Sequence, residues 1–279
     1  MKTYLVPTDY SETAHNAAIY AINLAKKDNA KIVLFNVFQI PYPVVQDTYI
    51  PLVSIDELRH DAKDALTKYK NKLLNTIQID INVECQVAPD FINEGINKYI
   101  KSHPVDLIVM GITGGSVLKE ILIGSNVINV VRHCKKNVLI VPKDAKFKEV
   151  KKIGFATTFD FENEGAVKKQ MKKYTDLFQA KLIAIHVNTS TELNTPEKRN
   201  VINHFNSAFS ELEFSVKEIV SENVAEEIEN YVQEKNCDWL ALVPKHTNLF
   251  ERLFNKTITK KLAFHLHVPI LAIHDEEFV

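Results

Sequence analysis

The chain has 279 residues, of which 46% are hydrophobic and 25% charged, a balance typical of ordinary globular proteins. Its 34 lysine and arginine residues against 35 aspartate and glutamate residues leave a formal net charge of −1. This charge gives the chain as a whole no attraction to nucleic acid or to an anionic membrane, and we expect neither as a partner.

The cysteines and the apolar stretches point to a reduced, soluble, cytoplasmic protein. Cys85, Cys134 and Cys237 are far apart and form no CxxC pair, which argues against a disulfide framework and a thiolate zinc site. The first ten residues, MKTYLVPTDY, are interrupted by polar residues, so we expect no signal peptide. Every apolar stretch is far shorter than the ~18 residues that a membrane span needs.

Strand and helix signals alternate along the first half of the chain. Ser11 is suited to cap a helix whose alanines recur at helical spacing, and the strand signals are short β-branched or aromatic runs. We expect strands at residues 4–7, 31–38, 83–87, 106–111 and 137–141, and helices at residues 14–25, 55–77, 91–100 and 125–134.

An internal repeat divides the chain. Residues 105–142 align without a gap with residues 237–274, and Asp106 falls on Asp238. Further upstream, AKIVLFNV in the first copy matches AKLIAIHV in the second, and YLVPTDY matches IGFATTF. A period this long indicates a duplicated domain and not a solenoid unit.

The repeat and the alternation together predict the fold class. We expect an α/β protein with two doubly wound five-stranded parallel-sheet domains, at residues 1–145 and 149–279, with helices on both faces of each sheet. The sequence alone leaves the strand order open. In such sheets ligands bind at the carboxyl ends of the strands, where the strand order reverses direction. In the first domain these ends carry Thr8 and Asp9, Val37 and Gly111.

The segment after the fourth strand is rich in glycine. Four of the seven glycines lie there, at Gly111, Gly114, Gly115 and Gly124. Glycine permits positive φ and lets a ligand approach the backbone, and Ser125 and Asn126 open a helix whose N-terminus suits an anion. This pattern predicts a phosphate cradle, although neither GxxxxGK[ST] nor GxGxxG is present. A simple turn capped by Ser125 is the alternative.

The spacing Gly111-x2-Gly114-x9-Gly124-Ser125 resembles the G-x2-G-x9-G-[S/T] signature of ATP-binding universal stress proteins. The segments YLVPTDYSE and FNV look like that family too, and the resemblance covers nearly the whole chain as a tandem of two such domains. It implies a Rossmann-like sheet, similar to adenine nucleotide alpha hydrolases, with strand order 3-2-1-4-5. Asp9 would then meet the glycine loop at the switch point.

The same resemblance implies a role for each site residue. Asp9, next to Thr8, and Gly111 would contact the ribose of ATP, and the backbone of Val37 would contact the adenine. The phosphates would be held at Gly114, Gly124, Ser125 and Asn126. A divalent metal such as Mg²⁺ would bind through the phosphates and not in a protein cage. Taken alone, Val37 could be an ordinary buried strand end and Asp9 a turn residue.

The second copy departs from this pattern. Val243, His246, Lys256 and Thr257 occupy the positions of Gly111, Gly114, Gly124 and Ser125, and Thr158 that of Asp9. Since Val243 and Lys256 place side chains where the first copy has bare backbone, we expect one ATP site per chain.

We therefore expect a tandem universal stress protein that binds ATP in its N-terminal domain and acts as a nucleotide-dependent stress-response regulator. A slow ATPase or phosphotransferase and an interaction module without nucleotide are the alternatives, and no catalytic triad order or carboxylate pair marks a dedicated enzyme. The family pairs its domains through their fifth strands, which implies a pseudo-dimer of residues 137–141 with residues 269–273. A homodimer and the protein partner are left open.

Overall fold

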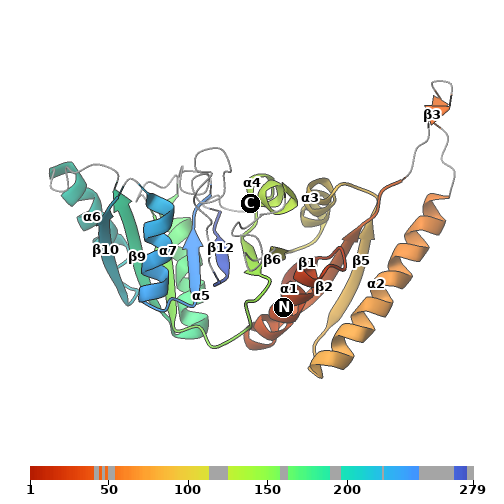
Figure 1. Cartoon of the computed structure of the whole chain (residues 1–279), viewed down its shortest axis with the longest axis horizontal. Coiled ribbons are helices and arrows are strands. Elements are labelled where there is room, and N and C mark those ends of the chain that lie inside the picture. Colours follow the sequence, from red (N-terminus) through yellow and green to blue (C-terminus); the bar gives the residue numbers. More distant parts are fainter. Residues whose placement is uncertain are drawn as a thin grey trace.

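The computed structural model describes residues 1–40, 44–45, 48–49, 54–112, 125–157, 163–188, 196–221, 223–244 and 267–274 (Figure 1). The strands are β1 (Lys2–Pro7), β2 (Ala30–Val37), β3 (Val44–Val45), β4 (Thr48–Tyr49), β5 (Val83–Ala88), β6 (Leu107–Ile112), β7 (Val138–Pro142), β8 (Lys152–Ala156), β9 (Lys181–Asn188), β10 (Phe214–Val220), β11 (Trp239–Leu242) and β12 (Ile270–Ala272). The helices are α1 (Glu12–Asp28), α2 (Ile55–Ile77), α3 (Ile92–Ser102), α4 (Ser125–His133), α5 (Glu164–Phe178), α6 (Pro196–Ala208) and α7 (Val224–Glu234).

Ten strands form one sheet in the order β10-β9-β8-β11-β12-β7-β6-β1-β2-β5. Counted along its own strands, each half has the order 3-2-1-4-5, and every strand pair within a half is parallel. The predicted pair of doubly wound five-stranded parallel sheets is therefore confirmed. The domain boundaries at residues 145 and 149 fall between β7 and β8, and they stay a prediction.

Helices cover both faces of this sheet, as parallel strands require. Side chains of α1, α2, α5 and α6 share one buried cluster, whereas those of α3, α4 and α7 share the other. The expected cap at Ser11 is present, since its Oγ accepts a hydrogen bond from Ala14 N at 3.3 Å. At the other end of α1, Asn29 takes the left-handed conformation and its N–H bonds Ala25 O, which stops the helix.

The two halves of the sheet join at a single antiparallel pair, β7 with β12. The register places Val138 opposite Ala272, Leu139 opposite Leu271 and Ile140 opposite Ile270. These are the fifth strands of the two halves, and their side chains are buried. The sheet is thus continuous from one half to the other.

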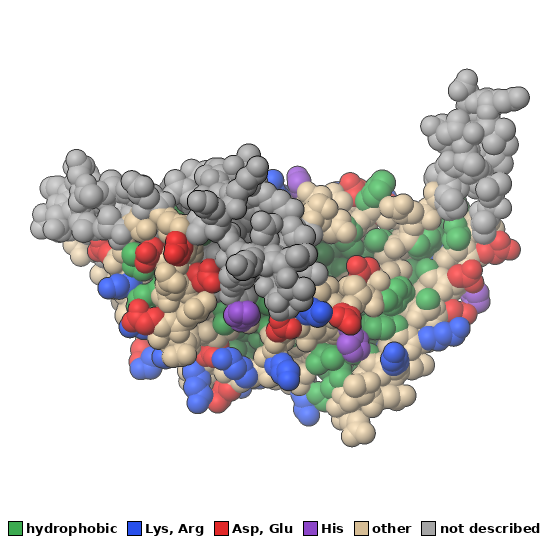
Figure 2. All heavy atoms as spheres, viewed as in Figure 1, with side chains coloured by type: hydrophobic (Ala, Val, Ile, Leu, Met, Phe, Trp, Pro, Cys, Tyr) green, Lys and Arg blue, Asp and Glu red, His purple; other side chains and the backbone are tan. Residues whose placement is uncertain are grey.

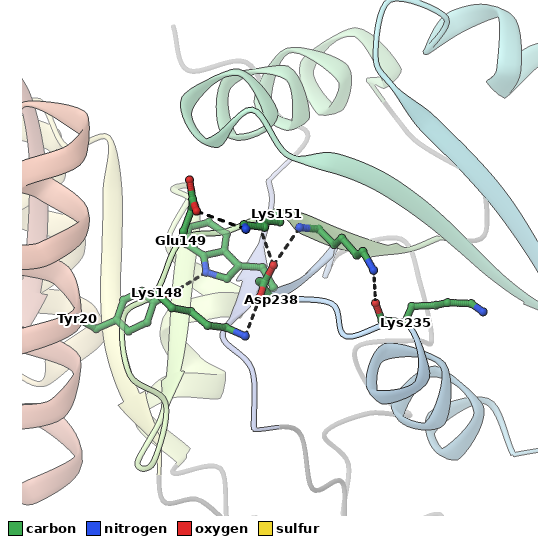
Figure 3. A network of polar contacts seen from close by, with 8 residues as sticks. Tyr20, Lys148, Glu149, Lys151, Lys235 and Asp238 are labelled. Atoms are coloured by element: carbon green, nitrogen blue, oxygen red, sulfur yellow. Dashed lines mark hydrogen bonds and ion pairs between the residues drawn. The ribbon is translucent and has the colours of Figure 1, made fainter.

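A second contact crosses the junction on the α1 face of the sheet. The indole Nε1–H of Trp239, in β11, donates a hydrogen bond of 2.7 Å to the hydroxyl of Tyr20, in α1 (Figure 3). Trp239 is fully buried, and its ring lies against those of Tyr174 and Phe178 in α5, with centroids 5.7 and 5.1 Å away. Burial also raises the pKa of Tyr20 above its usual value. Helix α1 of the first half is therefore anchored on a strand of the second half.

The two aspartates that the repeat aligns have the same structural role. Asp106 Oδ2 accepts a hydrogen bond from Thr3 N at 2.9 Å, at the start of β1. Asp238 Oδ2 accepts from Lys151 N at 2.7 Å and from Lys152 N at 3.0 Å, at the start of β8 (Figure 3). Each carboxylate thus satisfies backbone donors where the first strand of its half begins.

Charges of both signs share the surface. Lys148 Nζ lies 2.7 Å from Asp238 Oδ1, and Lys143 Nζ lies 2.9 Å from Glu12 Oε2. Figure 2 shows lysine and arginine side chains interspersed with aspartate and glutamate side chains on the face in view. This distribution agrees with the net charge of −1.

We predict that Tyr20→Phe lowers the free energy of unfolding by ~1–3 kcal/mol, because the buried indole N–H of Trp239 loses its acceptor. Equilibrium unfolding in urea measures the change. Tyr231→Phe is the matched control, since Tyr231 is only partly buried on α7, and it should change stability by less than ~0.5 kcal/mol. Equal stability of the two variants would show that the hydrogen bond makes no net contribution.

Candidate functional site

The carboxyl ends of β1, β2 and β6 form the candidate site. β1 and β6 pair only at Tyr4 with Leu107 and at Leu5 with Ile108, although both strands continue beyond these residues. β1 therefore parts from β6 toward its carboxyl end while it stays paired with β2 as far as Pro7. This is the switch point of the 3-2-1-4-5 order, where doubly wound sheets bind their ligands.

Residues 8–11 make a tightly bonded turn at this point. Thr8 is buried: its N–H donates to Phe35 O at 2.8 Å, and its carbonyl accepts from Asn36 Nδ2 at 2.8 Å. The Thr8 hydroxyl accepts from Tyr10 N at 3.1 Å, and Asp9 Oδ1 accepts from Ser11 N at 3.0 Å. Asp9 itself is exposed. The turn thus presents a carboxylate at the edge of the sheet on a fixed backbone.

Tyr10, in the same turn, takes a backbone conformation that is uncommon for a bulky residue, with φ at 64°. Its side chain is 40% exposed, and its ring meets that of Tyr69 edge to face, with centroids 5.4 Å apart. The Tyr69 hydroxyl lies 3.2 Å from His15 Nδ1. Sequence analysis did not single out Tyr69 or His15. The helical spacing gives the face of α2 on which Tyr69 lies, but it carries no information about the turn that this face meets.

Residue 111 must be a glycine for a packing reason that sequence analysis did not identify. A Cβ at this position would lie 2.2 Å from Thr13 O and 3.1 Å from Ala14 N, so the missing side chain lets α1 pack directly against β6. The φ of Gly111 is not positive. Gly111 therefore does not use the positive φ that glycine permits, and the close approach seen here is that of a helix backbone.

The remaining candidate residues are placed as follows. Val37 is the last residue of β2 and is half-buried against α3, with its Cγ1 3.1 Å from where a Cβ on Gly95 would lie. Ser125 and Asn126 are the exposed first residues of α4, whose buried side chains share one cluster with those of β6 and β7. Gly114 and Gly124, like Gly115, lie outside the described residues.

The second half repeats part of this edge. Thr157 N donates to Ile185 O at 3.1 Å, and the Thr157 carbonyl is hydrogen-bonded to His186 Nδ1 at 3.0 Å. Thr8 makes the equivalent two bonds in the first half, with Phe35 and Asn36. The counterpart of Gly111 is Val243, whose buried side chain occupies space that is bare backbone in the first half. The segment before α5, residues 157–163, is longer than residues 8–11, so α5 begins later. Thr158, His246, Lys256 and Thr257 lie outside the described residues.

The described residues were also compared with what a metal site, a membrane-spanning helix or a reactive cysteine would require. Within them, no three His, Cys, Asp or Glu side chains are grouped as a metal site would require. None of the described helices has the length and apolar character needed to cross a membrane. Burial raises the pKa of Cys134 to about 12 and that of Cys237 to about 11, so neither is a reactive thiol at neutral pH.

Comparison with known proteins agrees with this fold. A sequence model described as the Universal stress protein family matches residues 1–142. A universal stress protein of Methanocaldococcus jannaschii is 30% identical over 154 residues, which are 51% of this chain and 95% of that protein. A universal stress protein structure from Archaeoglobus fulgidus DSM 4304 covers 98% of both chains, with 18% identity and a TM-score of 0.70.

A putative universal stress protein of Pseudomonas aeruginosa UCBPP-PA14 has the same fold, with 14% identity and a TM-score of 0.57 over 98% of this chain and 93% of that one. Because the family match spans half of the chain, the chain belongs to the universal stress protein family. The two structures extend the likeness in fold to both halves.

We predict that Gly111→Ala destabilises the protein by ~1–3 kcal/mol, because the new Cβ forces α1 away from β6. Gly165→Ala is the control, since a Cβ there lies 3.5 Å from its nearest atom, Asn163 Oδ1, and alanine suits a helix better than glycine. Thermal unfolding compares the two variants. If both melt like the parent, α1 does not depend on the close approach at Gly111.

Proposed function

We propose that the chain binds ATP at the carboxyl edge of its first half and acts as a nucleotide-dependent stress-response regulator. The observation that carries this proposal is the parting of β1 from β6 after two paired residues, with the exposed Asp9 at the end of β1. Family membership and the spacing from Gly111 to Ser125 support it further. The second half lacks this spacing, so we propose one site per chain.

Each residue has a role that its chemistry fits. A carboxylate accepts several hydrogen bonds, so Asp9 retains capacity for ribose hydroxyls beside its bond from Ser11 N. The start of α4, at Ser125 and Asn126, offers backbone donors and the positive end of the helix dipole to phosphates. Gly114 and Gly124 would leave the preceding backbone open to them, and the backbone of Val37 would face the adenine.

Mg²⁺ would neutralise phosphate charge when bound with the nucleotide. No grouped set of protein ligands for it is present among the described residues, so we propose that the phosphates hold it. This chain's own part would be to orient the nucleotide between Asp9 and α4.

A regulator must pass the state of its site to another part of the molecule, and α1 is placed to do this. It begins at the Asp9 turn, and its Asn16 Nδ2 donates to Pro142 O, at the end of β7, and to Ala145 O, just after it, both at 2.9 Å. Tyr20 on the same helix contacts Trp239 of the second half. We propose that the β7–β12 pair makes the chain an intramolecular pseudo-dimer, across which α1 connects the site to the second half.

We predict that the purified protein binds one ATP per chain in isothermal titration, and that ADP and AMP compete. Gly114→Val and Gly124→Val should each weaken ATP binding more than tenfold, because a branched side chain blocks the phosphate loop. Asp9→Asn should weaken it less, since the amide still contacts the ribose without a charge.

Gly165→Ala, far from the loop in sequence and on α5, is the matched glycine control. Parent-like affinity in both valine variants would refute the site, and a parent that binds no nucleotide would favour the interaction module instead.

A further inference from the structure

Tyr69 joins three separate segments beside the candidate site. It lies on α2, and its ring meets Tyr10 of the turn at 5.4 Å and His15 of α1 at 5.8 Å, both edge to face. Its hydroxyl lies 3.2 Å from His15 Nδ1. Tyr69 is half-buried, so these contacts are partly shielded from water.

The two residues that precede Tyr10 also interact with the Tyr69 phenol. Burial raises the pKa of Tyr69 to about 12, a hydrogen bond with the Thr8 side chain opposes that rise, and the charge of Asp9 adds to it. The Thr8 hydroxyl in turn accepts the N–H of Tyr10. Tyr69 thus contacts Tyr10 directly, and Thr8 and Asp9 both influence its pKa.

The turn needs such support. A bulky residue with φ at 64° is strained by ~1–2 kcal/mol, and a strained conformation persists only where its surroundings hold it. Tyr69 supplies that hold from outside the turn, through ring contact with Tyr10 and through its hydroxyl.

We infer that Tyr69 is a positioning residue for the nucleotide: it fixes the turn of residues 8–11 so that the Asp9 carboxylate is presented to the ribose hydroxyls. This inference rests on the proposed function. Tyr69 itself need not touch the ligand, because its effect passes through the backbone on either side of Asp9.

The test compares ATP with 2′,3′-dideoxy-ATP, which lacks the ribose hydroxyls that would donate hydrogen bonds to Asp9. Tyr69→Phe keeps the ring contact with Tyr10 and removes only the hydroxyl. We expect its Kd for ATP to rise about five- to tenfold and its Kd for dideoxy-ATP to stay within about twofold of the parent value. A general loss of structure would weaken both nucleotides alike.

Tyr99→Phe is the matched control. Tyr99 also contacts a histidine ring, that of His103, in a parallel stack with centroids 4.2 Å apart, and it lies on α3. This variant should bind both nucleotides like the parent, and the melting temperature of each variant confirms that it is folded.

The outcomes separate the inference from the proposal beneath it. If the parent binds no ATP, the proposed function fails and the inference falls with it. If the parent binds ATP but Tyr69→Phe binds both nucleotides like the parent, or loses both equally, the inference alone is overturned. If the parent binds ATP and dideoxy-ATP with equal affinity, the ribose hydroxyls contribute nothing to binding, and the inference is overturned.

Discussion

The architecture of the molecule depends on one antiparallel strand pair, β7 with β12. An unpaired edge strand exposes a row of backbone donors and acceptors, and each half would have such an edge if it stood alone. Pairing the two edges satisfies these groups and brings α1 and α5 together across the junction. Trp239, Tyr174 and Phe178 pack together within the second half, and Tyr20 joins them from the first half across this junction.

The two halves share the contacts that hold their strands in register and differ in the residues at the carboxyl ends of those strands. Asp106 and Asp238 both anchor the start of a first strand, and Thr8 and Thr157 make equivalent backbone bonds. These contacts hold strands in register, so both halves need them. Gly111 lies against the backbone of α1, whereas Val243 carries a buried side chain, and the segment between the first strand and the next helix is longer in the second half. The frame of strands is therefore shared, whereas the two carboxyl edges differ in the residues that they present.

Most of the fold could be predicted from the sequence, because alternating strand and helix signals and a gapless repeat are local or linear patterns. The strand order came from the family resemblance, since several orders satisfy the same alternation. Contacts such as Tyr20 with Trp239, which are 219 residues apart, depend on how helices dock and leave no periodic signal. For the same reason the glycine spacing identified Gly111 but not the helix α1 that packs against it, and the helical pattern predicted a helix at residues 55–77 without showing what Tyr69 contacts.

The contact between Tyr20 and Trp239 has a spectroscopic consequence. Trp239 is the only tryptophan in 279 residues, so all indole emission from this protein comes from one buried site at the boundary between its halves. Its excited state is sensitive to the loss of the Tyr20 hydrogen bond and to the entry of water. Fluorescence therefore reports the docking of the first half on the second, together with the unfolding of the second half, without an attached dye.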